Sequence, residues 1–377
     1  MSSKAENYTM RVFYLLAIVF VVDGHMSMGH MFEMNGLFRY YSFHLMMFAF
    51  GSGYFFKLYG KPLSDLLHRA KKLLIPLYFW NLVYGVGAAL LRRLGGFELG
   101  EPLSAYTLLL APLADGEHFV WNLGSWFIFP FFCAQVFYAL VRRLSSLWHE
   151  NEWMTFLLCL IPGCVAVQLC YTGRQDILPI WMLRPMILLP GFAGGTLYRR
   201  VLERRDHLPT VPYLIGVVIL RALLCTRYEN LAYLLSDCSY FVCDAFGVYA
   251  GAALAIAFYL RISRLLAPYI GKSRLALAIS RNTFDVMMHH YMGFFALNCF
   301  FLIVHILGLG AADFSVHIFR TRSNYLYAPD ERAEWSVLYL LCGVTLPLMI
   351  GHTARAVKTR LQACLSRRRK PESGSAR

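Results

Sequence analysis

Charged residues are scarce in this chain: Asp, Glu, Lys and Arg make up only 15% of its 377 residues, whereas 58% are hydrophobic. A soluble domain of this size would carry nearer a quarter charged residues. Apolar runs of roughly 20 residues, the length that crosses a bilayer, recur along the whole chain. The composition therefore argues against a soluble globular domain and predicts a polytopic membrane protein.

Metal-ligand spacing and a cleavable leader are also missing. The ten cysteines include no CxxC pair, so we predict no metal site. No small-residue cleavage site follows the first apolar run, which we therefore expect to stay as a helix. No internal repeat is visible, and no segment between apolar runs is long enough for a soluble domain. We expect one membrane domain over residues 1–357 and a basic, disordered cytoplasmic tail over residues 358–377.

The hydropathy pattern predicts an all-α, polytopic transmembrane helix bundle of about ten spans. Lys and Arg gather in alternate connections, which by the positive-inside rule puts the N- and C-termini in the cytoplasm. The net charge of +14 thus follows from topology, and we expect membrane lipids but no nucleic acid as partners. The sequence does not define an oligomeric state. The predicted spans are residues 12–33, 37–57, 73–94, 119–141, 153–172, 178–198, 209–226, 239–260, 282–307 and 335–355.

Two segments are predicted to lie along the cytoplasmic surface rather than to cross the membrane. They are the basic amphipathic stretch PLSDLLHRAKKLL (Pro62–Leu74) and the stretch LLAPYIGKSRLALAIS (Leu265–Ser280). On the outer side, Cys225 and Cys238 flank one loop and could pair if that compartment is oxidising.

Titratable residues inside the first two spans are the strongest functional signal. VVDGHMSMGH (Val21–His30) ends an apolar run with an aspartate and two histidines, and such groups are costly in lipid without a partner or a task. Counting about 1.5 Å per residue puts His25 roughly 21 Å up a ~30 Å core and His44 roughly 10 Å below its outer surface. Two imidazoles at one depth on consecutive antiparallel helices suggest a shared site.

Other polar residues within the spans have a structural explanation as well. Asp23 lies about 200° around the helix from His25, so we expect it to serve another helix. Arg221 and Asp244 are separated by one short loop and could form an ion pair. His289 and His290 are predicted to lie lower, in the inner half of their span, and His30 is expected to be a packing residue.

Five segments, in order along the chain, resemble the acyltransferase 3 family of membrane proteins. The second-span segment matches its Phe-His…Ser-Gly-Tyr pattern, and the first matches a helix that ends in Val-Val-x-x-His. The family commonly has Arg or Lys eleven residues before that histidine, where this chain has Tyr14, and Arg11 is the nearest basic residue. The segments are LLAIVFVVDGH (Leu15–His25), YSFHLMMFAFGSGYFFK (Tyr41–Lys57), HRAKKLLIPLYFW (His68–Trp80), GSWFIFPFF (Gly124–Phe132) and ISRNTFDVMMHHYMGF (Ile279–Phe294).

The resemblance is closest to the subgroup that includes fucose O-acetylases. It implies ten or so helices and the transfer of an acyl group, usually acetyl from acetyl-CoA as co-substrate with no bound cofactor, to a hydroxyl of a surface or lipid-linked glycan. It implies a catalytic role for His25, and its second-span pattern carries over to His44, as a second catalytic residue, and to Ser52, as a substrate-binding residue. The expected location is the bacterial inner membrane.

The chemistry of acyl transfer assigns roles to further residues. Histidine, with a reference pKa of about 6.5, suits a general base, so we predict that His25 activates the acceptor hydroxyl. Trp126, Asn122 and Arg184 lie at a similar predicted depth and could bind the sugar or the oxyanion. The anionic donor should stay near the inner face, where we expect it to meet Arg11, Arg69, Lys71, Lys72, Arg274 and Arg281.

One other class of protein fits the same residues. A secondary transporter could use His25, His44, Asp244 and Asp285 as a proton relay for a sugar or an acid. The absence of an inverted repeat and the ordered motif matches favour the enzyme.

Overall fold

The computed structural model describes residues 6–26, 30–98, 100–114, 119–147, 151–322 and 325–368. Almost all of its regular structure is helical, as the sequence predicts. The helices are α1 Tyr8–Gly24, α2 His44–Tyr54, α3 Pro62–Gly95, α4 Ile128–Ser145, α5 Glu152–Tyr171, α6 Ile180–Leu197, α7 Thr210–Arg227, α8 Ala245–Ile270, α9 Arg274–Arg281, α10 Thr283–Ile306, α11 Val316–Thr321 and α12 Ser336–Arg368.

Short turns and one small hairpin complete the described structure. The strands β1 Tyr233–Leu234 and β2 Tyr240–Phe241 pair antiparallel between α7 and α8. The short helical turns are η1 Tyr40–Ser42, η2 Tyr106–Leu110, η3 Val120–Phe127, η4 Gln175–Ile177, η5 Tyr198–Leu202, η6 Glu203–Arg205, η7 Pro329–Glu331 and η8 Ala333–Trp335.

Polar side chains fix where several helices begin. Asn7 accepts a hydrogen bond from the backbone N–H of Met10 (2.9 Å) and caps α1. Asp244 caps α8 in the same way, through the N–H of Gly247 (3.0 Å). Each cap satisfies an N–H that would otherwise lack a partner in a low-dielectric setting.

Eight helices among the described residues are long and apolar enough to cross a membrane. Helices α1 and α2, which we predicted as parts of the first two spans, are shorter, at 17 and 11 residues. The first stops at Gly24 and the second begins only at His44, so the described residues between them, which we predicted as the outer parts of both spans, are not part of either helix. The chain is an integral, multi-pass membrane protein.

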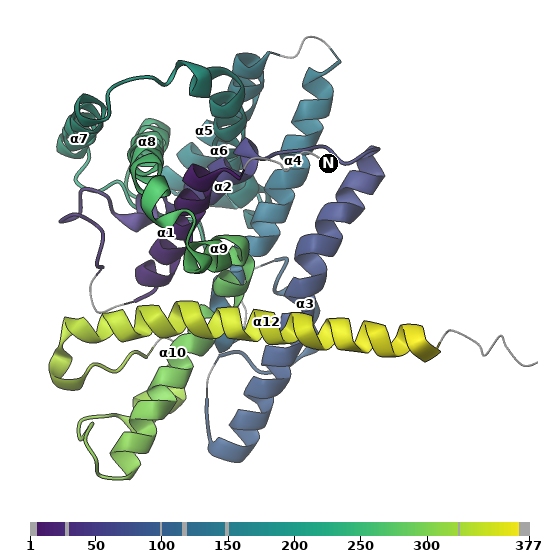
Figure 1. Ribbon diagram of the computed structural model, residues 1–377, viewed down its shortest axis with the longest axis vertical. Coiled ribbons are helices and arrows are strands. Elements are labelled where there is room, and N and C mark those ends of the chain that lie inside the picture. The colour runs from purple at the N-terminus through teal and green to yellow at the C-terminus, as the bar shows by residue number, and fades with distance from the viewer. Residues whose placement is uncertain are drawn as a thin grey trace, which may run out of the picture.

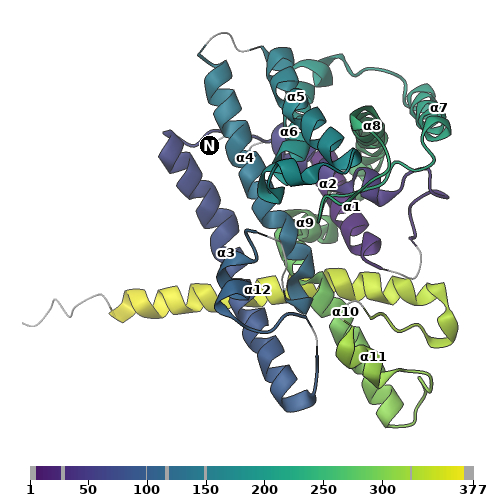
Figure 2. The ribbon, with the colours of Figure 1, turned by 180° about the vertical axis from the view of Figure 1, so that it is seen from behind.

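The two short helices lie in the upper half of the molecule in Figures 1 and 2, where α2 packs mainly on α6 and α1 packs mainly on α8. All but one of the residues of α2 are buried. Glycines let α2 and α6 approach closely, because a Cβ on Gly53 would collide with the carbonyl of Phe192 and one on Gly195 with the carbonyl of Phe50. The GSG stretch, residues 51–53, therefore serves helix packing.

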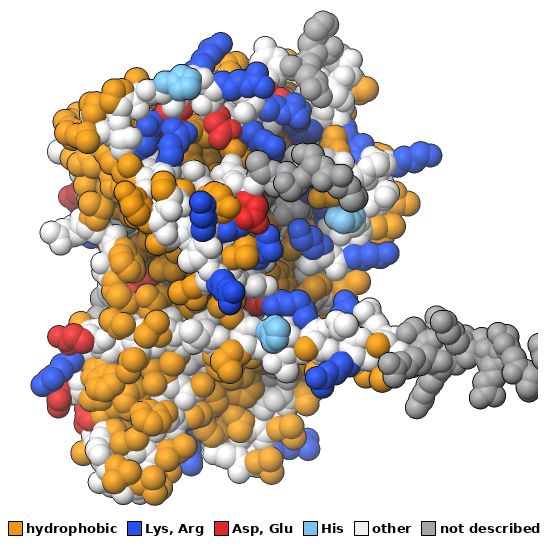
Figure 3. Space-filling view, viewed as in Figure 1, with side chains coloured by type: hydrophobic (Ala, Val, Ile, Leu, Met, Phe, Trp, Pro, Cys, Tyr) orange, Lys and Arg blue, Asp and Glu red, His pale blue; other side chains and the backbone are white. Residues whose placement is uncertain are grey.

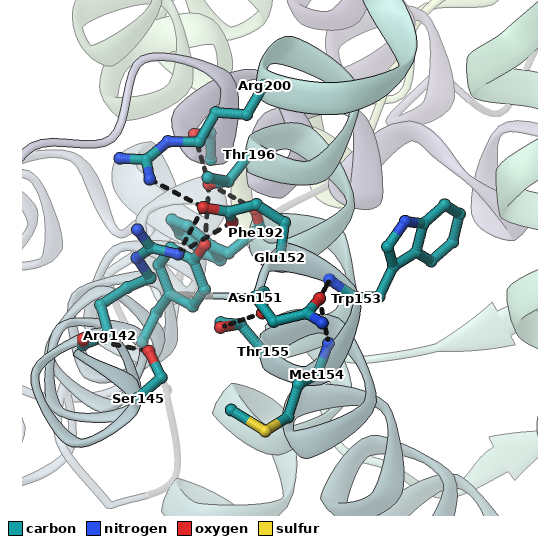
Figure 4. A network of polar contacts seen from close by, with 12 residues as sticks. Arg142, Ser145, Asn151, Glu152, Trp153, Met154, Thr155, Phe192, Thr196 and Arg200 are labelled. Carbon is teal, nitrogen blue, oxygen red and sulfur yellow. Dashed lines mark hydrogen bonds and ion pairs between the residues drawn. The ribbon is translucent and has the colours of Figure 1, made fainter. Parts of the chain in front are cut away.

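Ion pairs join the helices at one end of the bundle. Figure 4 shows Glu152 at the start of α5 between Arg142 of α4 (2.8 Å) and Arg200 of η5 (2.7 Å). In Figure 3 the basic side chains gather over the upper half of the molecule, whereas the lower half is largely apolar. We call the end that carries the ion pairs of Glu6, Asp65, Glu152 and Asp206 the basic end.

Three expectations about the basic end need correction. Residues 62–74 are not a separate surface helix, because α3 continues without a break from Pro62 to Gly95. Residues 265–280 are divided between the end of α8 and the short helix α9. Helix α12 continues to Arg368, through the first part of the segment predicted as a disordered tail, and residues 369–377 lie outside the described residues.

Candidate functional site

A cavity of about 110 Å³ lies where α1 ends and α2 begins. Its walls come from segments that are far apart in the sequence. They are Val21 and His25 at the end of α1, Tyr41, His44 and Leu45 around the start of α2, Gly124, Trp126 and Phe127 of η3, residues 233–236 beside the hairpin, and Met287 of α10. The two histidines selected from the sequence thus share one cavity.

His25 is held from the side of α10. It is the residue that follows the last turn of α1, and its Nδ1 lies 3.0 Å from the hydroxyl of Tyr291. Its ring stacks on the ring of His290, with centroids 5.0 Å apart and planes 23° apart. Because Nδ1 is engaged by Tyr291, Nε2 is the nitrogen available to a molecule in the cavity.

His44 is held by the backbone of its own segment. Its Nδ1 lies 2.5 Å from the carbonyl oxygen of Tyr40. A carbonyl can only accept, so Nδ1 carries the proton in the neutral ring and Nε2 carries the lone pair. The hydroxyl of Tyr41, on the same cavity wall, donates to the carbonyl of Gly24 (2.8 Å) and joins the start of α2 to the end of α1.

Asp23 supports the segment that carries His44, as the helical spacing predicts. Its carboxylate accepts hydrogen bonds from the hydroxyl of Tyr40 and from the backbone N–H of Met31 (2.9 Å). His30 contacts the carbonyl of Asp23 through Nδ1 (3.1 Å), which is a packing role. The aspartate therefore orders the chain between α1 and α2 and does not orient His25.

Arg221 ties the same segment to α7. Its guanidinium donates to the carbonyl of Leu37 (2.9 Å), to Oγ of Ser42 (2.6 Å) and to the carbonyl of Gly251. The predicted ion pair with Asp244 is wrong, because that carboxylate caps α8 and accepts from Tyr228 (2.8 Å). The buried arginine contacts the segment before His44 instead.

Of the residues proposed for the acceptor, Trp126 lies on the cavity wall. Arg184 lies behind it, with its guanidinium 5.5 Å from the centre of the indole ring and donating to the carbonyl of Ser236. Arg184 thereby contacts two wall residues, Trp126 and Ser236. It acts on the shape of the cavity and is not part of its lining.

The other two proposed acceptor residues lie elsewhere. Asn122 is fully buried and donates to Oδ1 of Asn81 on α3 (3.2 Å). Ser52 lies in the middle of α2 and shares a hydrogen bond with Tyr14. Both positions are explained by helix packing, so the structure supplies no contact between these side chains and the cavity.

Two site residues on α10 were misplaced or missed by the sequence analysis. His290 was expected at a lower level than His25, but the two rings stack. Tyr291 was not singled out at all, although the titratable run HHY was visible. Next to them, His289 bonds the hydroxyl of Tyr84 through Nδ1 (2.6 Å). Depth along a single helix cannot reveal which face of another helix lies opposite.

Three of the arginines proposed for the donor make contacts within the protein. Arg11 donates to the carbonyl of Gly271 (2.6 Å) and pairs with Glu6 (2.8 Å), which also pairs with Arg281 (3.0 Å). Arg69 is buried and pairs with Asp65 (3.0 Å). These residues join helices at the basic end.

The remaining donor candidates are exposed at the basic end. Lys71 and Lys72 lie near the start of α3, and Arg274 begins α9. A separate hollow of about 520 Å³ opens at this end, with Tyr8, Arg264 and Lys272 among its walls. This hollow was not foreseen from the sequence, because it forms between the starting residues of α1 and the last turns of α8.

The chain matches the acyltransferase 3 family, described as an acyltransferase domain, over residues 15–353. No curated protein and no solved structure matches it. The matched range contains every residue described above on the cavity wall, and it agrees with the family that the sequence resembles.

Proposed function

Because the chain belongs to the acyltransferase 3 family, we propose that it is a membrane O-acetyltransferase of a cell-surface or lipid-linked glycan. Membership in the family makes it a membrane acyltransferase. The proposal adds acetyl-CoA as the donor and a glycan hydroxyl as the acceptor. It also assigns the protein to the bacterial inner membrane and to the fucose O-acetylase-like subgroup of the family. The observation that carries it is the cavity shared by His25 and His44.

In the proposed reaction, His25 is the general base. Its Nδ1–H donates to the hydroxyl oxygen of Tyr291, which leaves the Nε2 lone pair for the proton of the acceptor hydroxyl. The sugar oxygen attacks the thioester carbonyl as its proton passes to Nε2. The tetrahedral intermediate collapses with loss of the CoA thiolate, which takes up a proton, and the acetyl ester remains on the glycan.

His44 is proposed to orient the acceptor. While the ring is neutral, its Nε2 accepts a hydrogen bond and cannot donate one, because the ring proton is on Nδ1 and is donated to the carbonyl of Tyr40. A second hydroxyl of the sugar is a suitable donor to it, and Trp126 offers an aromatic face against the apolar side of the ring. This arrangement would hold one hydroxyl toward His25 and another toward His44.

We propose that the donor enters from the basic end, which faces the cytoplasm. Lys71, Lys72 and Arg274 are exposed there and can meet phosphates, and Lys272 and Arg264 stand at the hollow beside α1. Arg11, Arg69 and Arg281 are engaged in internal ion pairs, so we assign them to the support of this end.

The first test compares membranes that contain the wild-type chain, His25→Ala or His44→Ala, supplied with radiolabelled acetyl-CoA. We expect label in the glycan fraction, released by mild alkali as an ester would be. His25→Ala should lower the rate by about 10²–10⁴-fold, the usual contribution of a general base. His44→Ala should cause a large but incomplete loss.

The control is His352→Ala, because His352 is exposed on α12 and is not among the residues that line the cavity. Amounts of protein in the membrane should match for all four chains. Wild-type rates for His25→Ala would remove His25 from the mechanism. Movement of a sugar across sealed vesicles without any acylation would favour the transporter instead.

A further inference from the structure

The segment between α7 and α8, residues 228–244, forms one wall of the cavity. Its residues 233–236, which include β1 and the turn after it, face the histidines across the cavity. Arg184 of α6 fastens this wall by donating to the carbonyl of Ser236. The position of the whole segment therefore affects the shape of the acceptor side of the cavity.

Two cysteines meet where this segment rests on α5. Cys238 lies in the turn between β1 and β2, and Cys170 lies in the last turn of α5. Both are buried, with 0% and 4% of their surface exposed, and the two thiols are neighbours. Helix α5 also contacts strand β2, so the two sulfurs meet within a larger packed contact.

The local backbone holds Cys238 toward α5. Its φ is +58°, in the left-handed region that a non-glycine residue adopts only when its surroundings favour it. Its Sγ also lies 3.7 Å from the carbonyl of Leu235, a wall residue. The turn thus directs this thiol to one neighbour, which is the requirement for a specific bond between two cysteines.

We propose that Cys170 and Cys238 form a disulfide in the mature protein. The inference rests on the orientation given under the proposed function, which puts this end of α5 in an oxidising compartment outside the cytoplasm. The neighbouring sulfurs need only approach to about 2 Å, the length of a disulfide.

Forming the disulfide removes two electrons from the two thiols, and these electrons pass to the disulfide of an oxidant protein of the thiol-oxidase class. The thiolate of one cysteine attacks that disulfide and gives a mixed disulfide, and the thiolate of the other displaces the oxidant. The oxidant leaves as a dithiol with two electrons and two protons. Because both thiols are buried once the segment docks on α5, this exchange takes place during folding.

The structure favours this pair over the one suggested by the sequence. Cys225 lies on α7 near Arg221, and within the described residues no contact between Cys225 and Cys238 is found. Cys243 precedes the cap of α8 and packs beside Gly247. These two cysteines are therefore matched controls from the same region.

The test is a disulfide map of the full-length protein from native membranes. Thiols are blocked with N-ethylmaleimide in denaturant, the chain is digested without reduction, and the peptides are identified by mass spectrometry. We expect linked peptides that contain Cys170 and Cys238, lost in Cys170→Ser and in Cys238→Ser but kept in Cys225→Ser and Cys243→Ser. Maleimide on both cysteines of the wild-type protein would overturn the proposal.

The wild-type map needs no variant, so a misfolded variant would not obscure the result. Activity is measured separately on the same membranes. In the double variant Cys170→Ala/Cys238→Ala we expect a several-fold higher KM for the acceptor with little change in KM for acetyl-CoA. A linked pair without any acetyl transfer would overturn the proposed function alone, and free thiols in an active enzyme would overturn only the disulfide.

Discussion

The two histidines of the cavity differ in the partner of Nδ1, and this difference separates their chemistry. His44 meets a carbonyl, which can only accept, so its tautomer is fixed. His25 meets the hydroxyl of Tyr291, which can donate or accept. The proton on His25 can therefore be at either nitrogen without loss of this hydrogen bond. Such freedom suits a base that takes up and releases a proton in each cycle.

Tyr291→Phe tests this positioning role. The variant keeps the ring that packs beside His25 but removes the hydroxyl at Nδ1, so the imidazolium that forms when Nε2 takes up a proton loses the acceptor of its Nδ1–H. We expect kcat to fall about 3- to 10-fold, the effect of one neutral hydrogen bond, with both KM values unchanged. Steady-state kinetics would measure this, with Tyr269→Phe, an 83% exposed tyrosine, as the control. A change in KM alone would argue against the role.

Sequence reasoning found the residues on two helices that follow each other in the chain and missed the contacts of helices that are far apart in sequence. His25 and His44 follow from residue counts along adjacent antiparallel spans and from the family pattern. The stack of His290 on His25 depends on how α10 packs against α1, which no count along either helix contains. Arg184 was correctly placed near Trp126 in depth, but its direction toward Ser236 depends on the hairpin segment.

At the scale of helices, the site is built from helix ends. Helix α1 stops at Gly24, and the next residue is His25, whereas His44 is the first residue of α2. Hydropathy alone did not predict these ends, because apolar Met, Phe and Leu residues recur between the two helices even though Glu33, Asn35 and Arg39 interrupt them. The described residues between the helices are instead held by Asp23, which accepts from Tyr40, and by Arg221 of α7, which donates to Ser42.

The start of α1 is attached to α9 through Glu6, and this attachment should depend on pH. A hydrogen bond from Arg11, together with the charge of Arg281, lowers the pKa of Glu6 below its ordinary value of 4.5. A carboxylate with a lowered pKa contributes stability that is fully present above the unfolded-state value and is lost as the pH falls through the folded-state value. The contribution should therefore be present at neutral pH and disappear below 4.5.

Thermal unfolding of wild type and Glu6→Gln in detergent would measure this contribution. We expect a slightly lower Tm for the variant at neutral pH, because the pair is exposed, and a difference in Tm that shrinks as the pH falls below 4.5. The control is Glu334→Gln, which alters an exposed carboxylate at the start of the last long helix region. A difference that persists at the lower pH would show that the side chain acts through packing and not through charge.

Across the whole molecule, the basic residues divide into two groups with different predicted effects. Lys71, Lys72 and Arg274 are exposed, so replacing each by Ala should raise the KM for acetyl-CoA several-fold and leave the fold intact. Arg69→Ala should instead lower the amount of folded protein, because it leaves the buried carboxylate of Asp65 with a weaker set of partners. Kinetics and detergent-resistant protein levels would separate the two groups, and unchanged kinetics in all three exposed variants would reject the donor site.

The orientation of the molecule can be tested with a cysteine that it already has. Cys364 is exposed near the end of α12, beyond the apolar part of that helix, and the positive-inside rule puts it in the cytoplasm. Leu309, 75% exposed after α10, is expected on the opposite side, because α12 is long and apolar enough to cross the membrane between the two residues. A membrane-impermeant maleimide added to sealed right-side-out vesicles should modify Leu309→Cys but not Cys364, with the reverse result in inside-out vesicles. Because peptides are identified by mass spectrometry, the other cysteines do not interfere.

Labelling of Cys364 from outside would place the basic end outside, where cytosolic acetyl-CoA could not reach it, and the proposed entry of the donor would fail.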